Sequence, residues 1–199
     1  MSNVSGTPSR PSPAPCDLEP IRVGTDYVVR GAQPEDAPAL VRVHIESWRT
    51  TYTGIVSENA FDQLEREAPA RESRWADRIR QSADAFYIAE HDARGPVGFS
   101  SGGANRENSH DFPGELYAIY VLKSHQGKGV GRALVREVTR HLLSIGVTSM
   151  IVWVLEANPY RRFYEKLGGL AARRRVVPVA GTPLPEIGYG WPDITPLAR

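Results

Sequence analysis

Three glycines stand at alternate positions in "SHQGKGVGRAL", residues 124–134, and basic residues accompany them. Glycine is used where the backbone must turn tightly or approach a ligand closely. Because the first amides of a helix lack intrahelical partners and lie at the positive end of its dipole, a glycine turn that leads into a helix binds phosphate. The stretch therefore predicts a pyrophosphate cradle, built from Gly127, Lys128, Gly129, Gly131 and Arg132.

Three kinds of phosphate ligand compete for such a cradle. A P-loop requires Gly-x-x-x-x-Gly-Lys-Ser/Thr, but Gly129 follows Lys128 here, so no hydroxyl is placed for magnesium and we reject this motif. The dinucleotide fingerprint is Gly-x-Gly-x-x-Gly. This sequence has Arg132 at the position of the third glycine, although Glu156 could hold a ribose. Coenzyme A is the third ligand. The local residues leave the last two ligands open.

The cradle needs a strand before it and a helix after it, and the sequence predicts both. "ELYAIYVL", residues 115–122, has the composition of a strand. Apolar residues at steps of three and four follow the glycines and predict a helix that ends near Ile145. The continuous apolar run at 149–155 predicts a strand covered on both faces. A short helix is expected at 159–169.

The remaining segments complete an α+β layout in one domain. The sequence predicts a single mixed, mostly antiparallel sheet flanked by helices. Its further strands are expected at 27–30, 85–90, 97–103 and in a terminal antiparallel pair, and its further helices from Pro34, at 57–64 and at 69–81.

The composition narrows the possible partners. The formal net charge of +1 gives no field that would favour nucleic acid or an anionic membrane. No apolar run reaches the roughly 20 residues of a spanning helix. A lone cysteine, Cys16, excludes an internal disulfide and a multi-cysteine metal site. We therefore expect a cytoplasmic protein that uses no metal and binds neither nucleic acid nor membrane.

The first 24 residues differ from the rest. "SGTPSRPSPAPC" is rich in serine and proline and has almost no apolar side chains to bury. Such a composition is typical of disorder. The sequence thus predicts a disordered tail at 1–24 and a folded domain at 25–199.

Three segments, taken in order, resemble one family. "QGKGVG", residues 126–131, matches the Gln/Arg-x-x-Gly-x-Gly/Ala signature of the GCN5-related N-acetyltransferase (GNAT) superfamily. "NPYRRFYEKLGG", which begins at Asn158, resembles the family's second signature, and residues 44–64 resemble the first helices of many bacterial members. The likeness extends from residue 27 to about 190. It implies the GNAT fold, with two splayed central strands.

The resemblance also implies a reaction, the transfer of acetyl from acetyl-CoA to an amine by direct attack. In such folds the pantothenate arm of the cofactor lies between the strands that match 115–122 and 149–155, and the glycine signature holds the pyrophosphate. Carried over to this chain, the expected cofactor-binding residues are Ile119, Tyr120, Val121, Gln126, Gly127, Lys128, Gly129, Val130, Gly131, Arg132 and Asn158.

Two residues stand where family members keep catalytic groups. Tyr164 matches the frequent general acid, although it follows Asn158 by six residues where many members have seven. Its alternative role is core packing. Glu115, four residues before Ile119, matches the catalytic glutamate of histone-type members. Its alternatives are a solvated carboxylate at a strand start, or a water chain that acts as the base in its place.

Two functions from different classes remain open at the level of the sequence. One is a catalytic N-acetyltransferase, and the other is a non-catalytic regulatory module that binds coenzyme A. The acceptor is left open between a small-molecule amine and a protein or peptide amine. Trp48, Arg49 and Tyr52 lie where related enzymes line the acceptor pocket. The terminal strands offer an edge through which two copies could form a homodimer.

Overall fold

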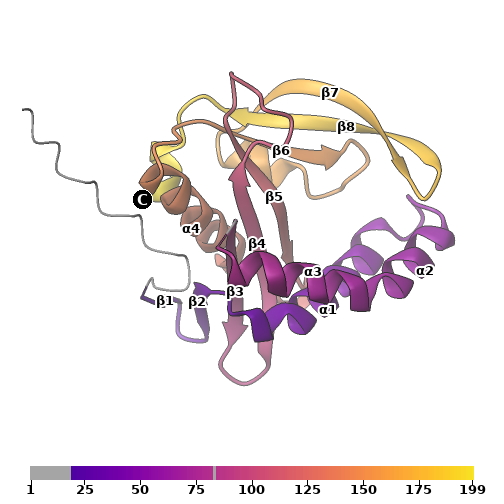
Figure 1. Ribbon diagram of the computed structural model, residues 1–199, viewed down its shortest axis with the longest axis horizontal. Coiled ribbons are helices and arrows are strands. Elements are labelled where there is room, and N and C mark those ends of the chain that lie inside the picture. Colours follow the sequence, from indigo (N-terminus) through magenta and orange to yellow (C-terminus); the bar gives the residue numbers. More distant parts are fainter. Residues whose placement is uncertain (1–18, 83) are drawn as a thin grey trace, which may run out of the picture.

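A computed structural model of the chain describes residues 19–82 and 84–199. It contains one eight-stranded sheet in the order β1-β2-β3-β4-β5-β6-β8-β7 (Figure 1). Neighbouring strands are antiparallel except β5 and β6, which are parallel. The strands are β1 (Ile21–Val23), β2 (Tyr27–Gly31), β3 (Ala85–His91), β4 (Gly95–Ala104), β5 (Gly114–Val121), β6 (Met150–Leu155), β7 (Leu170–Val179) and β8 (Thr182–Trp191). The predicted fold class is confirmed.

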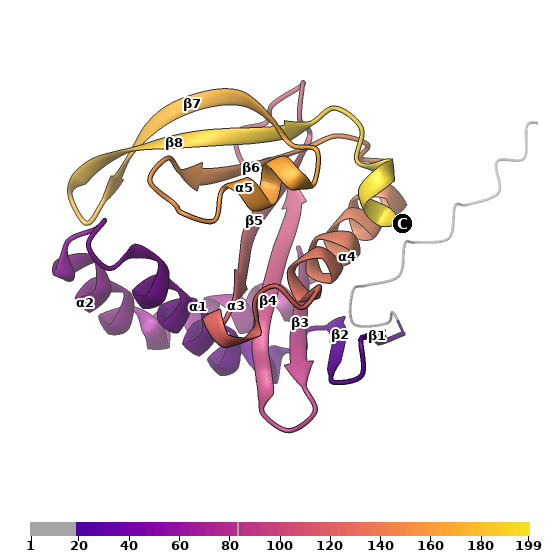
Figure 2. The same ribbon diagram turned by 180° about the vertical axis from the view of Figure 1, so that it is seen from behind.

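Helices cover both faces of this sheet. The α1–α3 group lies on the face toward the viewer in Figure 1, and the reverse view in Figure 2 shows α4 and α5 on the other face. The helices are α1 (Ala37–Tyr52), α2 (Glu58–Arg66), α3 (Ala68–Arg80), α4 (Val130–Ser144) and α5 (Arg162–Lys166). None of these helices has the length and apolarity needed to cross a membrane within the described ranges.

The main core lies where α4 packs on the sheet. Its inward stripe of Leu134, Val138 and Leu142 is fully buried, as the spacing of three and four predicts. A second, smaller core joins α1 and α2 to the β7–β8 hairpin through Tyr52 and Phe61. The hairpin thus reaches across to the early helices and closes one end of the molecule (Figure 1).

The two central strands separate halfway along their length. β5 pairs with β6 only from Gly114 to Leu116. The register between β4 and β5 shifts at the same level, because Ser101 pairs with Ala118 whereas Gly102 pairs with Leu116. Tyr117 is therefore the extra residue of a β-bulge, which bends its strand. The bulge directs the rest of β5 away from β6.

Two predicted boundaries differ from the structure. Strand β1 occupies Ile21–Val23, inside the range predicted as a disordered tail, because it pairs with β2. Residues 1–18, with Cys16, lie outside the described residues. The helix predicted at 159–169 is shortened to Arg162–Lys166. Asn158 causes this shortening, because its side-chain Oδ1 accepts the Tyr160 N–H at 2.8 Å and holds a turn before the helix.

An ion-pair network joins the start of the helical layer to the sheet. The half-buried Arg30 of β2 donates to both oxygens of Asp36, at 2.7 and 3.0 Å, and to both oxygens of Glu90 on β3, at 2.9 Å each. Burial by itself would raise the pKa of Asp36, but the hydrogen bonds from Arg30 and from the Gln33 backbone hold it below its usual value. The carboxylate of Asp36 therefore stabilises the folded state only while it is ionised.

We predict that Arg30→Met lowers the free energy of unfolding at neutral pH by roughly 2 kcal/mol, the scale of hydrogen bonds to charged groups. The pKa of Asp36 in the folded state lies below its ordinary value of 3.8. The Asp36 carboxylate therefore stabilises the folded state above pH 3.8, and this stabilisation is lost as the pH falls below that value. The wild type should therefore lose stability in this acid range more steeply than Arg30→Met. Denaturant unfolding at a series of pH values measures both effects.

Arg22→Met is the matched control. Arg22 pairs with Asp92 at 2.9 Å, but both side chains are about half exposed. Such surface pairs contribute at most about 1 kcal/mol. A loss of stability from Arg22→Met as large as that from Arg30→Met would contradict the importance given to the half-buried network around Arg30.

Candidate active site

One pocket of about 360 Å³ opens where β5 leaves β6. Its wall is formed by α1, the end of β5, the glycine stretch, the first turn of α4 and the segment from Asn158 to Tyr164. The structure brings most of the predicted site residues together on this wall: Ile119, Tyr120, Val121, Gln126, Gly127, Gly129, Gly131, Arg132, Asn158 and Tyr164.

The glycine stretch forms the expected turn into a helix. Gly127 and Gly129 have φ angles of 73° and 86°, in the left-handed region that favours glycine. Gly129 caps α4, and the first intrahelical bond runs from the Ala133 N–H to the Gly129 oxygen at 3.1 Å. The amides between these two residues precede that bond and have no intrahelical acceptor. They are available to an anion such as a pyrophosphate.

The end of β5 offers a second set of unpaired backbone groups. Residues Ile119–Val121 pair with β4 along one edge only, since β6 has already separated. The carbonyl of Val121 is used, because the Gln126 side-chain amide donates to it at 3.0 Å. This hydrogen bond ties the glycine stretch to the strand. The other edge of β5 suits an extended, amide-containing ligand that pairs as a strand would.

Two predicted cofactor residues lie off the pocket wall. Val130 is buried in the core at 1% exposure. Lys128 holds its ammonium 5.9 Å from the centre of the Tyr27 ring, beside the cradle. Val130 can thus contribute only its backbone amide, whereas Lys128 is placed to add positive charge near the rim.

Asn158 already has partners for both ends of its side-chain amide. Its Nδ2 donates to the Tyr52 hydroxyl at 2.8 Å, and its Oδ1 accepts the Tyr160 N–H. Asn158 therefore fastens the segment before α5 to the end of α1, and one Nδ2 hydrogen remains for a ligand. Of the three residues expected at the acceptor pocket, Tyr52 lines this pocket, whereas Trp48 and Arg49 do not.

Helix α1 also contributes two residues that sequence reasoning missed. Ser47 and Thr51 line the pocket. Ser47 is 3% exposed, and its Oγ has no hydrogen-bond partner among the described residues. A buried hydroxyl without a partner costs about 1–3 kcal/mol. The signal for Ser47 and Thr51 was their spacing of four on the inward side of a helix, which places both on one face.

Tyr164 lies on the pocket wall at 8% exposure, stacked on Tyr189 with 5.8 Å between ring centres. Burial raises the pKa of its phenol above the usual value, and Tyr120 adds to this rise. Tyr164 is therefore protonated at neutral pH and faces the pocket as a hydrogen-bond donor.

Glu115, in contrast, has no place on the pocket wall. Its side chain is 3% exposed and forms a salt bridge with Arg106. The Arg106 Nε donates to one carboxylate oxygen at 3.0 Å, and the Arg106 backbone N–H donates to the other at 3.0 Å. Both oxygens are thus occupied, and the role of Glu115 as a base stays a prediction.

Comparison with known proteins identifies the family. Residues 44–169, more than half of the chain, match the Acetyltransferase (GNAT) family. The chain belongs to this family. An uncharacterized N-acetyltransferase of Bacillus subtilis, YuaI, is 37% identical over 169 residues, which cover 85% of this chain and 95% of the relative. The GNAT assignment makes the chain an acetyl-CoA-dependent N-acetyltransferase.

Two further comparisons extend the GNAT assignment. A spermidine N(1)-acetyltransferase of Thermoplasma acidophilum is 26% identical over 143 residues, covering 70% of this chain and 86% of the relative. The crystal structure of the PaiA N-acetyltransferase from the same organism, in complex with coenzyme A, superposes with a TM-score of 0.62 at 20% identity. That superposition covers 81% of this chain and 97% of the other. It shows that the two proteins share the GNAT fold.

We predict that Gly127→Ala weakens acetyl-CoA binding about tenfold or more. A Cβ at this position meets nothing within 4 Å, but it disfavours the left-handed backbone by roughly 1–2 kcal/mol and so distorts the cradle. Calorimetric titration with acetyl-CoA measures the dissociation constant.

Gly146→Ala serves as the matched control for the cradle. Gly146 also has a positive φ, 80°, with nothing within 4 Å of an added Cβ, but it follows the far end of α4. Both variants should lose similar stability, whereas only Gly127→Ala should lose affinity. Equal dissociation constants in the two variants would contradict the assignment of the cradle.

Proposed function

We propose that this GNAT protein acetylates the amino group of a small molecule or peptide in the pocket between α1, β5 and α5. One observation carries the proposal: a single pocket joins an anion cradle, an unpaired strand edge and a buried phenol. The first two suit the diphosphate and the amide-containing arm of acetyl-CoA. The phenol would then lie near the reacting end.

The proposed roles follow from these positions. The amides at the start of α4 bind the pyrophosphate, with Lys128 near the rim. The free edge of β5 aligns the arm, and a backbone N–H near Val121 stabilises the oxyanion that develops on the acetyl carbonyl. Tyr164 supplies the proton that the departing sulfur requires.

The volume of the pocket limits how much of the acceptor can enter it. The cofactor arm takes part of a volume of about 360 Å³, so only the reacting end of an acceptor fits inside. The Thermoplasma relative is named for spermidine, which shows that a small amine is an acceptor in this family. Residues at the mouth, such as Tyr160 at 38% exposure, would then contact the remainder of the acceptor.

We predict that Tyr164→Phe lowers kcat by about tenfold or more, the typical contribution of a general acid. The substitution removes the phenolic hydroxyl and keeps the ring stacked on Tyr189. The measurement is thiol release from acetyl-CoA with a panel of amines, once a reactive amine has been found. Unchanged kinetics would assign Tyr164 to packing alone.

Tyr189→Phe is the control for this experiment. Its hydroxyl donates to Glu165 at 2.8 Å and lies outside the pocket wall. This variant also removes one hydroxyl from the stacked pair of rings. Its kcat should stay within about twofold of the wild-type value. Tight binding of acetyl-CoA without thiol release for any amine would instead support a regulatory module and overturn the proposed function.

A further inference from the structure

The pocket wall carries very little charge. Arg132 is the one permanently charged side chain among its described residues, and it lies at the cradle end. The other ionisable groups on the wall are Tyr52, Tyr120, Tyr160 and Tyr164. The described wall thus holds no carboxylate or imidazole that could accept a proton from a substrate or stabilise its positive charge.

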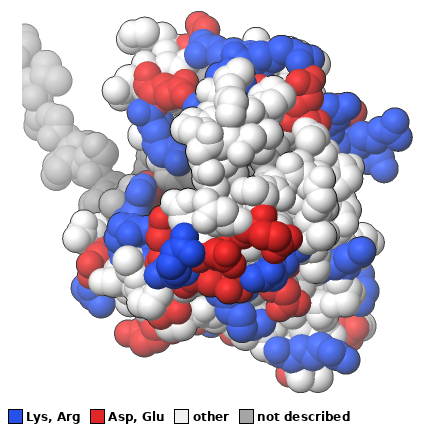
Figure 3. All heavy atoms as spheres, turned by 90° about the vertical axis from the view of Figure 1, so that its right-hand side faces the viewer, with Lys and Arg blue, Asp and Glu red and all other residues white. Residues whose placement is uncertain are grey.

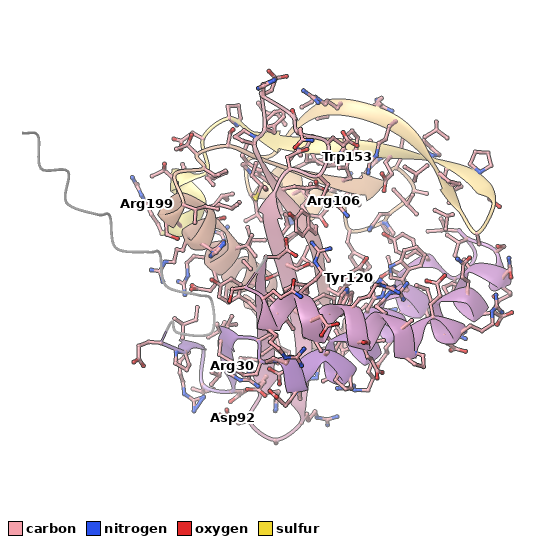
Figure 4. All side chains as sticks on the ribbon, in the orientation of Figure 1. Arg30, Asp92, Arg106, Tyr120, Trp153 and Arg199 are labelled. Atoms are coloured by element: carbon pink, nitrogen blue, oxygen red, sulfur yellow. The ribbon has the colours of Figure 1, made fainter. Side chains whose placement is uncertain are left out.

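Two carboxylates beside the splayed strands form salt bridges with arginines. Glu115 is held by Arg106, and Glu186 on β8 accepts from the Arg175 Nε at 2.8 Å. Arg175 also lies over the ring of Trp153, 4.0 Å from its centre. Figure 4 shows Arg106 and Trp153 toward the β7–β8 hairpin and Tyr120 closer to the early helices. Both carboxylates are thus paired with an arginine, and Arg175 also pairs with Glu107. Glu165, next to Tyr164, accepts from the Tyr189 hydroxyl instead.

The tyrosines act as neutral donors. Burial raises the pKa of Tyr52 and of Tyr120 above the usual value, and the charge of Glu186 adds a smaller rise at both. The Tyr52 oxygen accepts from Asn158, and the Tyr120 oxygen accepts from the Trp48 Nε1 at 2.9 Å. Because each oxygen is engaged as an acceptor, each phenol keeps its own proton for a ligand.

His44 on α1 is the remaining candidate for a base, and its surroundings exclude that role. The residue is 9% exposed, and its ring packs against Trp75 and Tyr120; His44 is not part of the pocket wall. Burial, reinforced by the charge of Arg71, lowers the pKa of His44 to about 3. His44 is thus neutral and a very weak base at physiological pH.

We propose that the acceptor is a weakly basic amine, and that it reaches the acetyl group already as the uncharged free base. This inference rests on the proposed function, because it takes the pocket as the site of transfer. An ammonium group that entered the pocket would lose its hydration without gaining a negative partner. A neutral amine avoids this cost and finds hydroxyl donors on the wall.

The reaction balances without an enzymic base when it begins from the free amine. The nitrogen lone pair forms the C–N bond, and the C–S bond breaks with its electron pair on sulfur. The proton that nitrogen loses replaces the one that Tyr164 gives to sulfur, so no net proton is taken up or released. Starting from an ammonium ion, one proton would have to pass from the pocket to solvent.

The proposal selects between classes of acceptor. At pH 7 roughly one in ten α-amino groups is uncharged, against about one in 2,500 lysine side chains. Peptide α-amines and aryl amines therefore fit the pocket better than lysines or polyamines. Figure 3 agrees with this choice for the side of the molecule that it shows, because acidic and basic side chains are intermixed around an uncharged central area.

Three amines of nearly equal shape test the inference: 2-phenylethylamine and its β-fluoro and β,β-difluoro derivatives, whose basicity falls with each fluorine. The measurement is kcat/KM for thiol release from acetyl-CoA as a function of pH. We expect the midpoint of the rising limb to shift with the acceptor, by as many pH units as its basicity changes. A midpoint that stays in place for all three amines would assign proton removal to an enzyme group and overturn the inference.

Glu115→Gln supplies the second arm of this test. If Glu115 is the base, its loss removes the rising limb; under the present proposal the limb persists in the variant and still moves with the acceptor. Thermal unfolding is followed in parallel, because the variant also loses the salt bridge to Arg106.

A third measurement does not require turnover of these amines. In the presence of coenzyme A, 2-phenylethanol should bind at least tenfold more tightly than the permanent cation trimethyl(2-phenylethyl)ammonium, and calorimetry compares the two. Tighter binding of the cation would overturn the inference. If acetyl-CoA binds but no amine releases thiol, the proposed function fails; if thiol is released with a fixed midpoint, only the present inference fails.

Discussion

Strand β5 carries one residue more than the stretch of β4 that it faces, and that residue is Tyr117. The bulge bends β5 at the level where its pairing with β6 ends, after Leu116. A regular strand would continue to pair with β6 and close the sheet. Because pairing stops, the backbone edge from Ile119 to Val121 is open, and the pocket forms beside it. The cradle, the phenols and α1 are all arranged around this one interruption.

The pocket wall combines polar groups that the fold leaves unsatisfied. The amides at the start of α4 lack intrahelical acceptors because the helix begins there, and the Ser47 hydroxyl, buried on the inward face of α1, has no partner in the described part of the chain. The Ser47 hydroxyl is buried and costs free energy in the isolated protein, whereas water can reach the exposed turn at Gly127 and Gly129. A ligand that bonds to Ser47 offsets this cost, so a feature that reduces stability favours binding.

Charge near the pocket is compensated locally. Arginines pair with Glu115 and Glu186, and a third, Arg78, pairs with the buried Asp84. The side chains of Glu115 and Asp84 are 3% and 5% exposed, so their salt bridges offset the hydration lost on burial. As a result the interior beside the splayed strands is polar but close to neutral. The phenols and hydroxyls that remain on the pocket wall contribute hydrogen bonds rather than net charge.

The sequence by itself determined the elements and the cradle, because both depend on local patterns. The spacing of apolar residues identified α4 and the buried β6, and the glycines at 127–131 identified the turn that leads into α4 and that we propose as the anion cradle. Each of these patterns is formed by residues that lie close together in the sequence. The family resemblance added the position of Tyr164, and the structure places that residue on the pocket wall.

Tertiary structure alone decided how these parts serve one site. Strand β1 was missed because three residues become a strand only by pairing with β2. The hydrogen bond between Asn158 and Tyr52 joins two segments that are distant in sequence. Ser47 is buried because such distant segments pack together. Arg106 was not identified as the partner of Glu115, because the loop that carries it folds back over the strand. Contacts between distant segments depend on how the whole chain packs, and no local pattern of residues encodes them.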